Sequence, residues 1–302
     1  MPPTPAPPPL PAPEVVATLH ERIRQWFGEN ARDLPWRRTD PWGVYVSEVM
    51  SHQTPVARVE PVWRYWMQRW PEPAALAADS PGEAVREWGR LGYPRRALRL
   101  HESAVAMVDR HDGRVPDTYE ALLALPGVGP YTAGAVMAFA FGRRATVLDV
   151  NIRRVQARAV SGRALPDPAV SRAETALATA LLPAGDADSA TWNAGTMELG
   201  ALICTARTPD CEACPLREGC AWVAAGCPAH EGPPPRGQAW HGTDRQVRGN
   251  LMAMLRATPD PVPAQHLEQA WPDKSQRDRC LDGLLRDGLA VRIDEEHYAL
   301  PG

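Results

Sequence analysis

Four cysteines within seventeen positions constrain this chain more than any other feature of its sequence. Their spacing is Cys-x6-Cys-x2-Cys-x5-Cys, and they are Cys204, Cys211, Cys214 and Cys220. A disulfide framework would spread its cysteines along the chain, so this crowding indicates a metal site in a reducing compartment. Four thiolates can hold either one tetrahedral zinc ion or a [4Fe–4S] cluster. A zinc ribbon would usually pair two Cys-x2-Cys knuckles, and this loop has only one.

Helical periodicity dominates the chain up to about residue 225. From Glu14 onward, Val15, Leu19 and Ile23 recur at steps of four residues, as on one face of a helix. Short turns rich in Gly, Pro and Asp separate later apolar segments with the same period, and no segment alternates as a strand would. We therefore expect an all-α region, preceded by a disordered Pro-rich tail over residues 1–13.

The C-terminal part has a different composition. Residues 227–242 are rich in Pro and Gly, which predicts a linker. Residues 289–300 alternate around a polar Asp-Glu-Glu turn, which predicts a β-hairpin. Helical patterns before this hairpin cover residues 243–257, 263–270 and 275–288. Three helices and a hairpin predict a small winged-helix-like unit over residues 243–302.

Charge and hydropathy limit the function classes. The formal net charge is −3, so nucleic-acid binding would depend on a local basic face rather than on overall charge. No apolar run is long enough to span a membrane, and the N-terminus lacks the pattern of a signal peptide. We expect no membrane association and a cytoplasmic location.

A glycine-rich turn joins two helical patterns in the middle of the chain. Gly127 and Gly129 permit a tight turn that leads into a helix beginning near Thr132. The free N–H groups at such a helix end can hold a backbone phosphate of a nucleic acid, whatever its base sequence. An ordinary connection between two helices has the same appearance in the sequence. Twenty positions after Gly129, Asp149 follows an apolar pair, a position that suits a helix N-cap.

These segments resemble the endonuclease III and MutY superfamily of DNA glycosylases. The cysteine spacing resembles the cluster loop of that superfamily, and the glycine turn resembles its helix-hairpin-helix. Residues 46–54 resemble the MutY segment that carries the catalytic glutamate, which falls on Glu48. The resemblance covers about residues 15–225 and identifies the chain as MutY-like. It implies a [4Fe–4S] cluster on the four cysteines and an essential aspartate at Asp149.

The fold that this resemblance implies is mainly α and has two lobes with DNA held between them. The cluster lobe would comprise residues 14–40 and 148–226. The six-helix lobe, with the helix-hairpin-helix, would comprise residues 41–147.

The two carboxylates have distinct expected roles. Apolar neighbours of Glu48 predict partial burial, which would raise its pKa and keep it protonated near neutral pH. A protonated Glu48 can donate to N7 of adenine and so weaken the glycosidic bond. An ionised Asp149 can then stabilise the oxocarbenium-like sugar. The resemblance further implies that Tyr131 and Asn151 line the sugar and orient Asp149.

The reaction is expected to stop at base removal. Bifunctional relatives such as endonuclease III carry a lysine where this chain has Tyr131, and the only lysine here is Lys274 in the C-terminal part. We therefore expect a monofunctional glycosylase. Two alternatives remain open: an endonuclease III-like glycosylase for damaged pyrimidines, and a non-catalytic iron–sulfur protein that binds DNA.

The resemblance also implies how DNA is held. Gln53 and Tyr93 match residues that wedge beside the opposite base, and Trp36 and Arg37 match the wall of the adenine pocket. The partner would be double-stranded DNA with adenine opposite 8-oxoguanine or guanine, bound in the nucleoid by a monomer. Basic residues that could contact phosphates are Arg95, Arg96, Arg99, Arg143, Arg144, Arg153 and Arg154.

Several positions depart from the family pattern. Ser51-His52 stands where Leu-Gln is common, Pro94 replaces the second Tyr of a frequent Gly-Tyr-Tyr, and Ala194 replaces an adenine-contacting Glu or Gln. About sixty residues follow the linker, too few for the Nudix-like domain of many MutY proteins. The chain is in this respect similar to short actinobacterial relatives.

Overall fold

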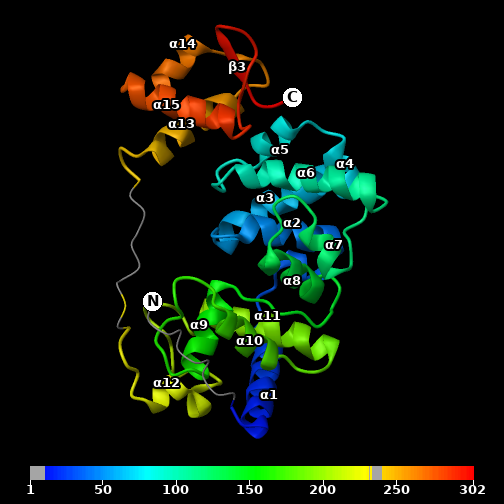
Figure 1. The fold of residues 1–302 in the computed structure, drawn as a ribbon, viewed down its shortest axis with the longest axis vertical. Helices are drawn as coiled ribbons and strands as arrows, with labels where there is room; N and C mark the ends of the chain where they lie inside the picture. Colours follow the sequence, from blue (N-terminus) through cyan, green and yellow to red (C-terminus); the bar gives the residue numbers. More distant parts are fainter. Residues whose placement is uncertain (1–10, 231, 233–239) are drawn as a thin grey trace. The chain divides into compact units, whose positions relative to one another are not determined.

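The computed structural model describes residues 11–230, 232 and 240–302, in two compact units (Figure 1). Unit 1 comprises Met1–Val44, Asp117–Leu123 and Val128–Pro233, and unit 2 comprises Tyr45–Pro116, Ala124–Gly127 and Pro234–Gly302. Most of the predicted Pro-rich tail, and much of the predicted linker, lie outside the described residues. No helix among the described residues is both long enough and apolar enough to cross a membrane.

Unit 1 is built around two long helices that come from opposite ends of its sequence. Helix α1 (Pro13–Asn30) packs on α11 (Asp186–Leu202), with Leu19 and Ile23 buried against side chains of α11. A Cβ at Gly195 would lie 2.6 Å from Cγ2 of Ile23, so glycine permits this close approach. The other elements are η1 (Pro35–Arg38), α7 (Tyr119–Leu123), α8 (Pro130–Phe139), α9 (Val150–Ala159), α10 (Arg172–Ala180), η2 (Arg217–Gly219) and α12 (Ala221–Ala224).

The first part of unit 2 is a helical layer with a tryptophan core. Trp66 makes edge-to-face contacts with Trp70 and Trp88, at ring-centroid distances of 4.7 and 5.7 Å. All three side chains are buried, and rings in this geometry stabilise a core beyond the area that they bury. The helices are α2 (Pro41–Ser51), α3 (Val56–Arg69), α4 (Pro73–Ala77), α5 (Pro81–Glu87) and α6 (Arg95–Arg110), and α6 packs on α4 and α5.

The C-terminal part of unit 2 has the predicted helices and hairpin. The helices are α13 (Asp244–Arg256), α14 (Ala264–Leu267) continued by η3 (Glu268–Ala270), and α15 (Lys274–Arg286). The predicted hairpin forms from β2 (Val291–Arg292) and β3 (His297–Ala299). A third strand, β1 (Val262–Pro263), was not predicted because it has only two residues; it pairs antiparallel with β3. The strand order is β1-β3-β2.

Candidate active site and metal centre

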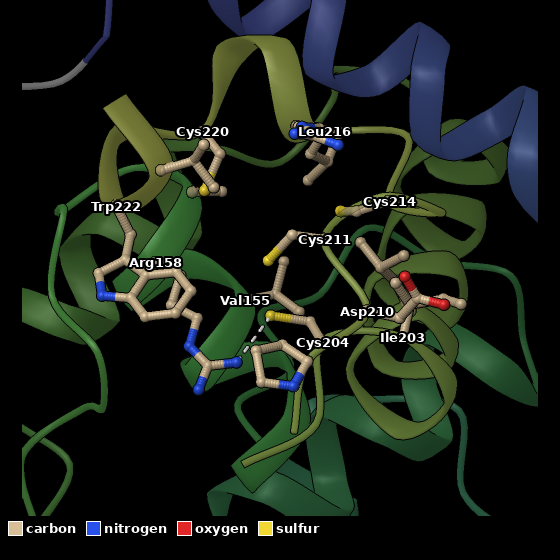
Figure 2. A pocket seen from close by; sticks show the side chains of 15 residues that line it. Val155, Arg158, Ile203, Cys204, Asp210, Cys211, Cys214, Leu216, Cys220 and Trp222 are labelled. Carbon is tan, nitrogen blue, oxygen red and sulfur yellow. Dashed lines mark hydrogen bonds between the residues drawn. The ribbon is translucent and has the colours of Figure 1, made fainter. Parts of the chain in front are cut away.

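The four cysteines of the predicted metal site line one cavity of unit 1 (Figure 2). The cavity has apolar walls that include Val155 and Leu216. Arg158 of α9 donates from Nη1 to Sγ of Cys204 at 3.3 Å, and its guanidinium stacks 4.7 Å from the ring centroid of Trp222. Burial raises the pKa of the Cys211, Cys214 and Cys220 thiols, and the charge of Arg158 opposes this rise at Cys211.

The four cysteines surround one common cavity and offer four thiols as donors. Four thiols around such a space are a donor set for a [4Fe–4S] cluster, and also for one tetrahedral zinc ion.

Asp149 is the N-cap of α9, as its sequence position indicated. Its Oδ1 accepts from the backbone N–H groups of Asn151 and Ile152, at 3.0 and 2.6 Å, and its Oδ2 accepts from Nδ2 of Asn151 at 2.7 Å. Burial raises the pKa of Asp149, while these three hydrogen bonds and the charge of Arg154 favour the carboxylate and oppose the rise. The carboxylate is therefore held in one orientation by its own helix.

A buried arginine links this aspartate to the cysteine loop. Arg154 donates to Oδ1 of Asn151 at 2.8 Å, to the carbonyl oxygen of Gly200 at 2.6 Å and to that of Cys204 at 2.6 Å. The hydrogen bonds therefore run from the backbone of Cys204 through Arg154 and Asn151 to the carboxylate of Asp149. The cysteine loop and the aspartate are therefore connected through two side chains, those of Arg154 and Asn151.

Tyr131 is the second residue of α8, directly after the glycine turn. Tyr131 packs against the small apolar cluster of Ala135, Ala138, Val147 and Ile152, two of which flank Asp149 in sequence. Gly127 has a φ of 78°, which favours glycine, and Gly129 is the N-cap of α8. Helices α7 and α8, on either side of the turn, contact each other as expected for a helix-hairpin-helix.

Glu48 belongs to unit 2 and is buried, as its apolar neighbours predicted. Its exposed fraction is 9%, and Val46 and Met50 on the same helix are fully buried. Glu48 and Asp149 lie in different compact units.

Gln53 and Tyr93, which each lie in a loop, both have backbones in the left-handed region, with φ values of 54° and 49°. Backbone strain of this kind is sustained only where surrounding contacts enforce it, and it often occurs at functional sites. Here the contacts come from Arg96 of α6. Its guanidinium donates to the carbonyl oxygens of His52, at 2.7 Å, and Gly92, at 3.1 Å, and also to Val49, Met50 and Thr54.

Three of the predicted phosphate contacts are wrong. The guanidinium of Arg96 donates its hydrogen bonds to acceptors within the protein, and burial lowers its pKa to about 10. Arg153 and Arg154 are 8% exposed; Arg153 pairs with Glu174 at 2.9 Å, and Arg154 binds backbone carbonyls. Their guanidinium groups face inward because buried carbonyl oxygens need donors. Arg95, Arg99, Arg143 and Arg144 remain surface residues, and their contact with DNA stays a prediction.

Glu198 is a functional candidate that sequence reasoning missed. It is 2% exposed, and it accepts from the guanidinium groups of Arg32, at 2.7 and 2.8 Å, and Arg37, at 3.0 Å. Burial acts to raise the pKa of Glu198, but the hydrogen bonds from Arg32 and the charge of Arg37 outweigh it and leave the pKa lowered. Glu198 thus fixes Arg37, which lies with Trp36 in η1 (Pro35–Arg38), in the segment predicted to form a wall of the base pocket.

Two family models match the chain. The model for HhH-GPD superfamily base excision DNA repair proteins matches residues 46–178, and the model for the iron–sulfur binding domain of endonuclease III matches residues 204–220. The second match covers the four cysteines and supports the cluster over zinc.

Full-length relatives are similar to this chain over nearly all of its length. An adenine DNA glycosylase of Mycobacterium tuberculosis (strain ATCC 25618 / H37Rv) is 49% identical over 300 residues, which cover 97% of this chain and 98% of the relative. An adenine DNA glycosylase of Mycolicibacterium smegmatis is 48% identical over 93% of this chain and 95% of its own length. Among solved structures, a thermostable thymine-DNA glycosylase has a TM-score of 0.63 at 29% identity, covering 70% of this chain and 98% of that one.

Proposed function

Because this chain belongs to the adenine DNA glycosylases of the HhH-GPD superfamily, we propose that it excises adenine mispaired with 8-oxoguanine or guanine, with Glu48 and Asp149 as its catalytic residues. It is a base excision repair enzyme with a [4Fe–4S] cluster. Its cluster ligands would be Cys204, Cys211, Cys214 and Cys220. Four iron–thiolate bonds, when present, hold the cysteine loop folded.

Glu48 would act as the general acid. Its side chain is buried, and burial is a general means by which a carboxyl group is kept available as an acid near neutral pH. Protonation of adenine at N7 turns a poor leaving group into a neutral one, and the C1′–N9 bond breaks toward an oxocarbenium-like sugar. The carboxylate form of Glu48 would remain after this proton transfer. Water would then add to C1′ of the sugar and lose a proton, which gives the abasic site.

Asp149 would stabilise the positive sugar, and its hydrogen bonds are the observation that carries this proposal. Two backbone N–H groups and Asn151 hold the carboxylate in a fixed orientation, which is what electrostatic stabilisation of a developing charge requires. Asn151 would be a positioning residue. Tyr131, which packs on the same apolar cluster as Ile152, would line the sugar.

Recognition of the mispair would use residues from several segments of the chain. Gln53 and Tyr93 would wedge beside the base opposite adenine after adenine is extruded. Trp36 and Arg37 would form a wall of the adenine pocket, while Gly127 and Gly129 would bring backbone N–H groups to a phosphate. We further propose that the enzyme acts as a monomer on double-stranded DNA in the nucleoid.

Strand cleavage through a Schiff base would not follow base removal. The only lysine of the chain, Lys274, begins α15 and pairs with Asp278 at 2.7 Å on the exposed surface of the C-terminal part. Tyr131 occupies the position of the lysine in bifunctional relatives and has no amine. The product would be an abasic site that breaks only on treatment with alkali, and borohydride should trap no covalent complex.

Single-turnover kinetics on a duplex with adenine opposite 8-oxoguanine test the proposal. Glu48→Gln and Asp149→Asn should each slow base release by about 10²–10⁴-fold, the range of a lost acid–base group, with little loss of duplex affinity. Glu60→Gln, which removes a partly exposed carboxylate of α3 that pairs with Arg64, is the matched control and should retain the wild-type rate.

Three outcomes would contradict the proposal. Full activity of Glu48→Gln would exclude its role as the acid. Release of damaged pyrimidines in place of adenine would favour the endonuclease III-like alternative. Tight duplex binding by the wild-type protein without release of any base would favour a DNA-binding protein.

A further inference from the structure

The C-terminal part of unit 2 is docked on α5 and α6 by specific contacts. A Cβ at Gly82 in α5 would collide with the carbonyl oxygen of Pro301, so only glycine allows the C-terminal segment to lie this close. Arg86 of the same helix donates to the carbonyl oxygens of Arg256, at 2.7 Å, and Thr258, at 2.6 Å. Because these acceptors lie at the end of α13, the bonds fix that helix relative to α5.

A second set of contacts fixes the same helix beside the start of α6. Asp287, at the end of α15, forms ion pairs with Arg95 of α6, at 3.4 Å, and with Arg248 of α13. Arg95 is two residues from Tyr93, the residue predicted to wedge beside the opposite base. The docked C-terminal part therefore brings the first turn of α13 to the loop that carries Tyr93.

At this junction, arginine and aromatic side chains alternate in a ladder. Its rungs, in order, are Trp240, Arg245, Tyr93, Arg96 and Trp88. The guanidinium carbons lie 5.2–5.5 Å from the ring centroids, within the range of a cation–π interaction. The inner end is the buried Trp88, and the outer end is Trp240, which is 44% exposed.

Tyr93 is the rung that two arginines share. The guanidinium carbon of Arg96, which also donates to carbonyl oxygens of the loops that carry Gln53 and Tyr93, lies 5.5 Å from the centroid of the Tyr93 ring. The guanidinium carbon of Arg245, from the C-terminal part, lies 5.4 Å from the same centroid. The ring is still 44% exposed, so part of it is available to a partner while the rest is held. Without Arg245, the ring would lose the contact that comes from α13 and could leave its position more readily.

We propose that Arg245 is a positioning residue through which the C-terminal part sets Tyr93 for reading the base opposite adenine. This inference rests on the proposed function of Tyr93. It gives residues 240–302 a role in discriminating between mispairs. Arg245 acts through Tyr93, and its planar guanidinium is required, because a lysine keeps the charge but cannot stack in the same way.

The experiment measures discrimination between two mispairs. Single-turnover rates are determined for adenine opposite 8-oxoguanine and opposite guanine, and dissociation constants are determined for duplexes that carry 2′-fluoro-2′-deoxyadenosine opposite each base. Arg245→Ala should reduce the ratio of the single-turnover rates on the two mispairs about threefold, as expected for loss of one partly exposed cation–π contact. Arg245→Lys should shrink it similarly.

Two comparisons isolate Tyr93 as the route. In a Tyr93→Ala background, Arg245→Ala should have no further effect on the ratio, since coupled residues are non-additive. Arg292→Ala is the matched control, because Arg292 stacks 5.3 Å from the ring centroid of Tyr298 within the same C-terminal part. It removes an equivalent charge and contact away from Tyr93, and it should leave the ratio at the wild-type value.

An unchanged ratio in Arg245→Ala would overturn the inference. So would additive effects of the two substitutions, or an equal loss of affinity for every duplex with a reduced salt dependence, which would mark Arg245 as a phosphate contact instead. Failure of the proposed function is distinguishable, because the wild-type protein would then release no adenine from either duplex.

Discussion

Replacement of Arg154 by methionine would cut the hydrogen-bonded path between the cysteine loop and Asp149. Methionine keeps an unbranched apolar side chain, so the main loss is the guanidinium and its donors. Those donors now reach Asn151 at 2.8 Å and the carbonyl oxygens of Gly200 and Cys204 at 2.6 Å each. The substitution therefore tests whether positioning of the aspartate depends on this arginine.

The expected magnitude follows from the acceptors that remain. Arg154 is 8% exposed, so water reaches these oxygens poorly once the donor is gone. A buried acceptor without a partner costs about 1–3 kcal/mol, and the costs at one site add incompletely. We expect a loss of about 3 kcal/mol in the free energy of unfolding. At about 2–4 °C per kcal/mol, this corresponds to roughly 6–12 °C in Tm.

The rate of base release should fall more than stability alone explains. Asn151 would lose the donor that holds its Oδ1, and with it the fixed direction of its bond to Oδ2 of Asp149. A misplacement of about 1 Å can cost about 10²-fold in rate. Single-turnover rates at 20 °C, where the variant stays folded, should therefore fall about 10- to 100-fold, while the dissociation constant for the duplex changes little.

Arg153→Met is the matched control for this experiment. Arg153 lies on the same helix, is equally buried, and binds Glu174 and the carbonyl oxygen of Asp167, at 2.6 Å, rather than Asn151. Its replacement should destabilise the protein by a similar amount and leave the rate within a few-fold of wild type. Equal rate losses in the two variants, or a wild-type rate in Arg154→Met, would refute the positioning role.

Two further substitutions test the interior of unit 1. Glu198→Gln should cost about 2 kcal/mol at pH 7, because water compensates the partly exposed Arg32 and Arg37 in part. The pKa of Glu198 is lowered on folding, so its contribution to the free energy of unfolding is complete above about pH 4.3, the usual pKa of Glu. This contribution is lost as the pH falls through the lower pKa of the folded state. Urea unfolding should show the difference from wild type shrinking toward pH 3, and a constant difference would exclude the charge as its source. Gly200→Ala would place a Cβ 2.7 Å from that of Asn151, and it should lower the free energy of unfolding by about 1–3 kcal/mol and slow base release. Gly28→Ala, with open space around it, should be neutral or stabilising. Equal stability of the two variants in thermal unfolding would contradict the close packing of α9 on α11.

Features with local causes were predictable from the sequence. The apolar repeat through Leu19 and Ile23 placed α1, and the acid after an apolar pair placed Asp149 as an N-cap. The three C-terminal helices and the hairpin followed from the same periodicities. In each case, the residues that determine the feature are within a few positions of one another.

Features that depend on distant backbone atoms were not predictable. Arg96, Arg153 and Arg154 read as surface cations, but their acceptors are mainly carbonyl oxygens, which every residue has and no sequence pattern marks. Glu198 accepts from Arg32, which lies 166 positions earlier. Only the folded chain shows which charges are internal, and this decides which remain available for DNA.

The pairing of α1 with α11 has a consequence for synthesis. Leu19 and Ile23 emerge early, but Trp192 and Leu199, which bury them, are translated about 170 residues later. At about 5–20 residues per second, the nascent chain carries an unpartnered apolar stripe for roughly ten to thirty seconds. A lone helix of this length is marginal in water. Ribosomes that stop before residue 199 therefore release chains whose first helix has nothing to pack on. We expect such chains to be bound by chaperones or degraded by proteases.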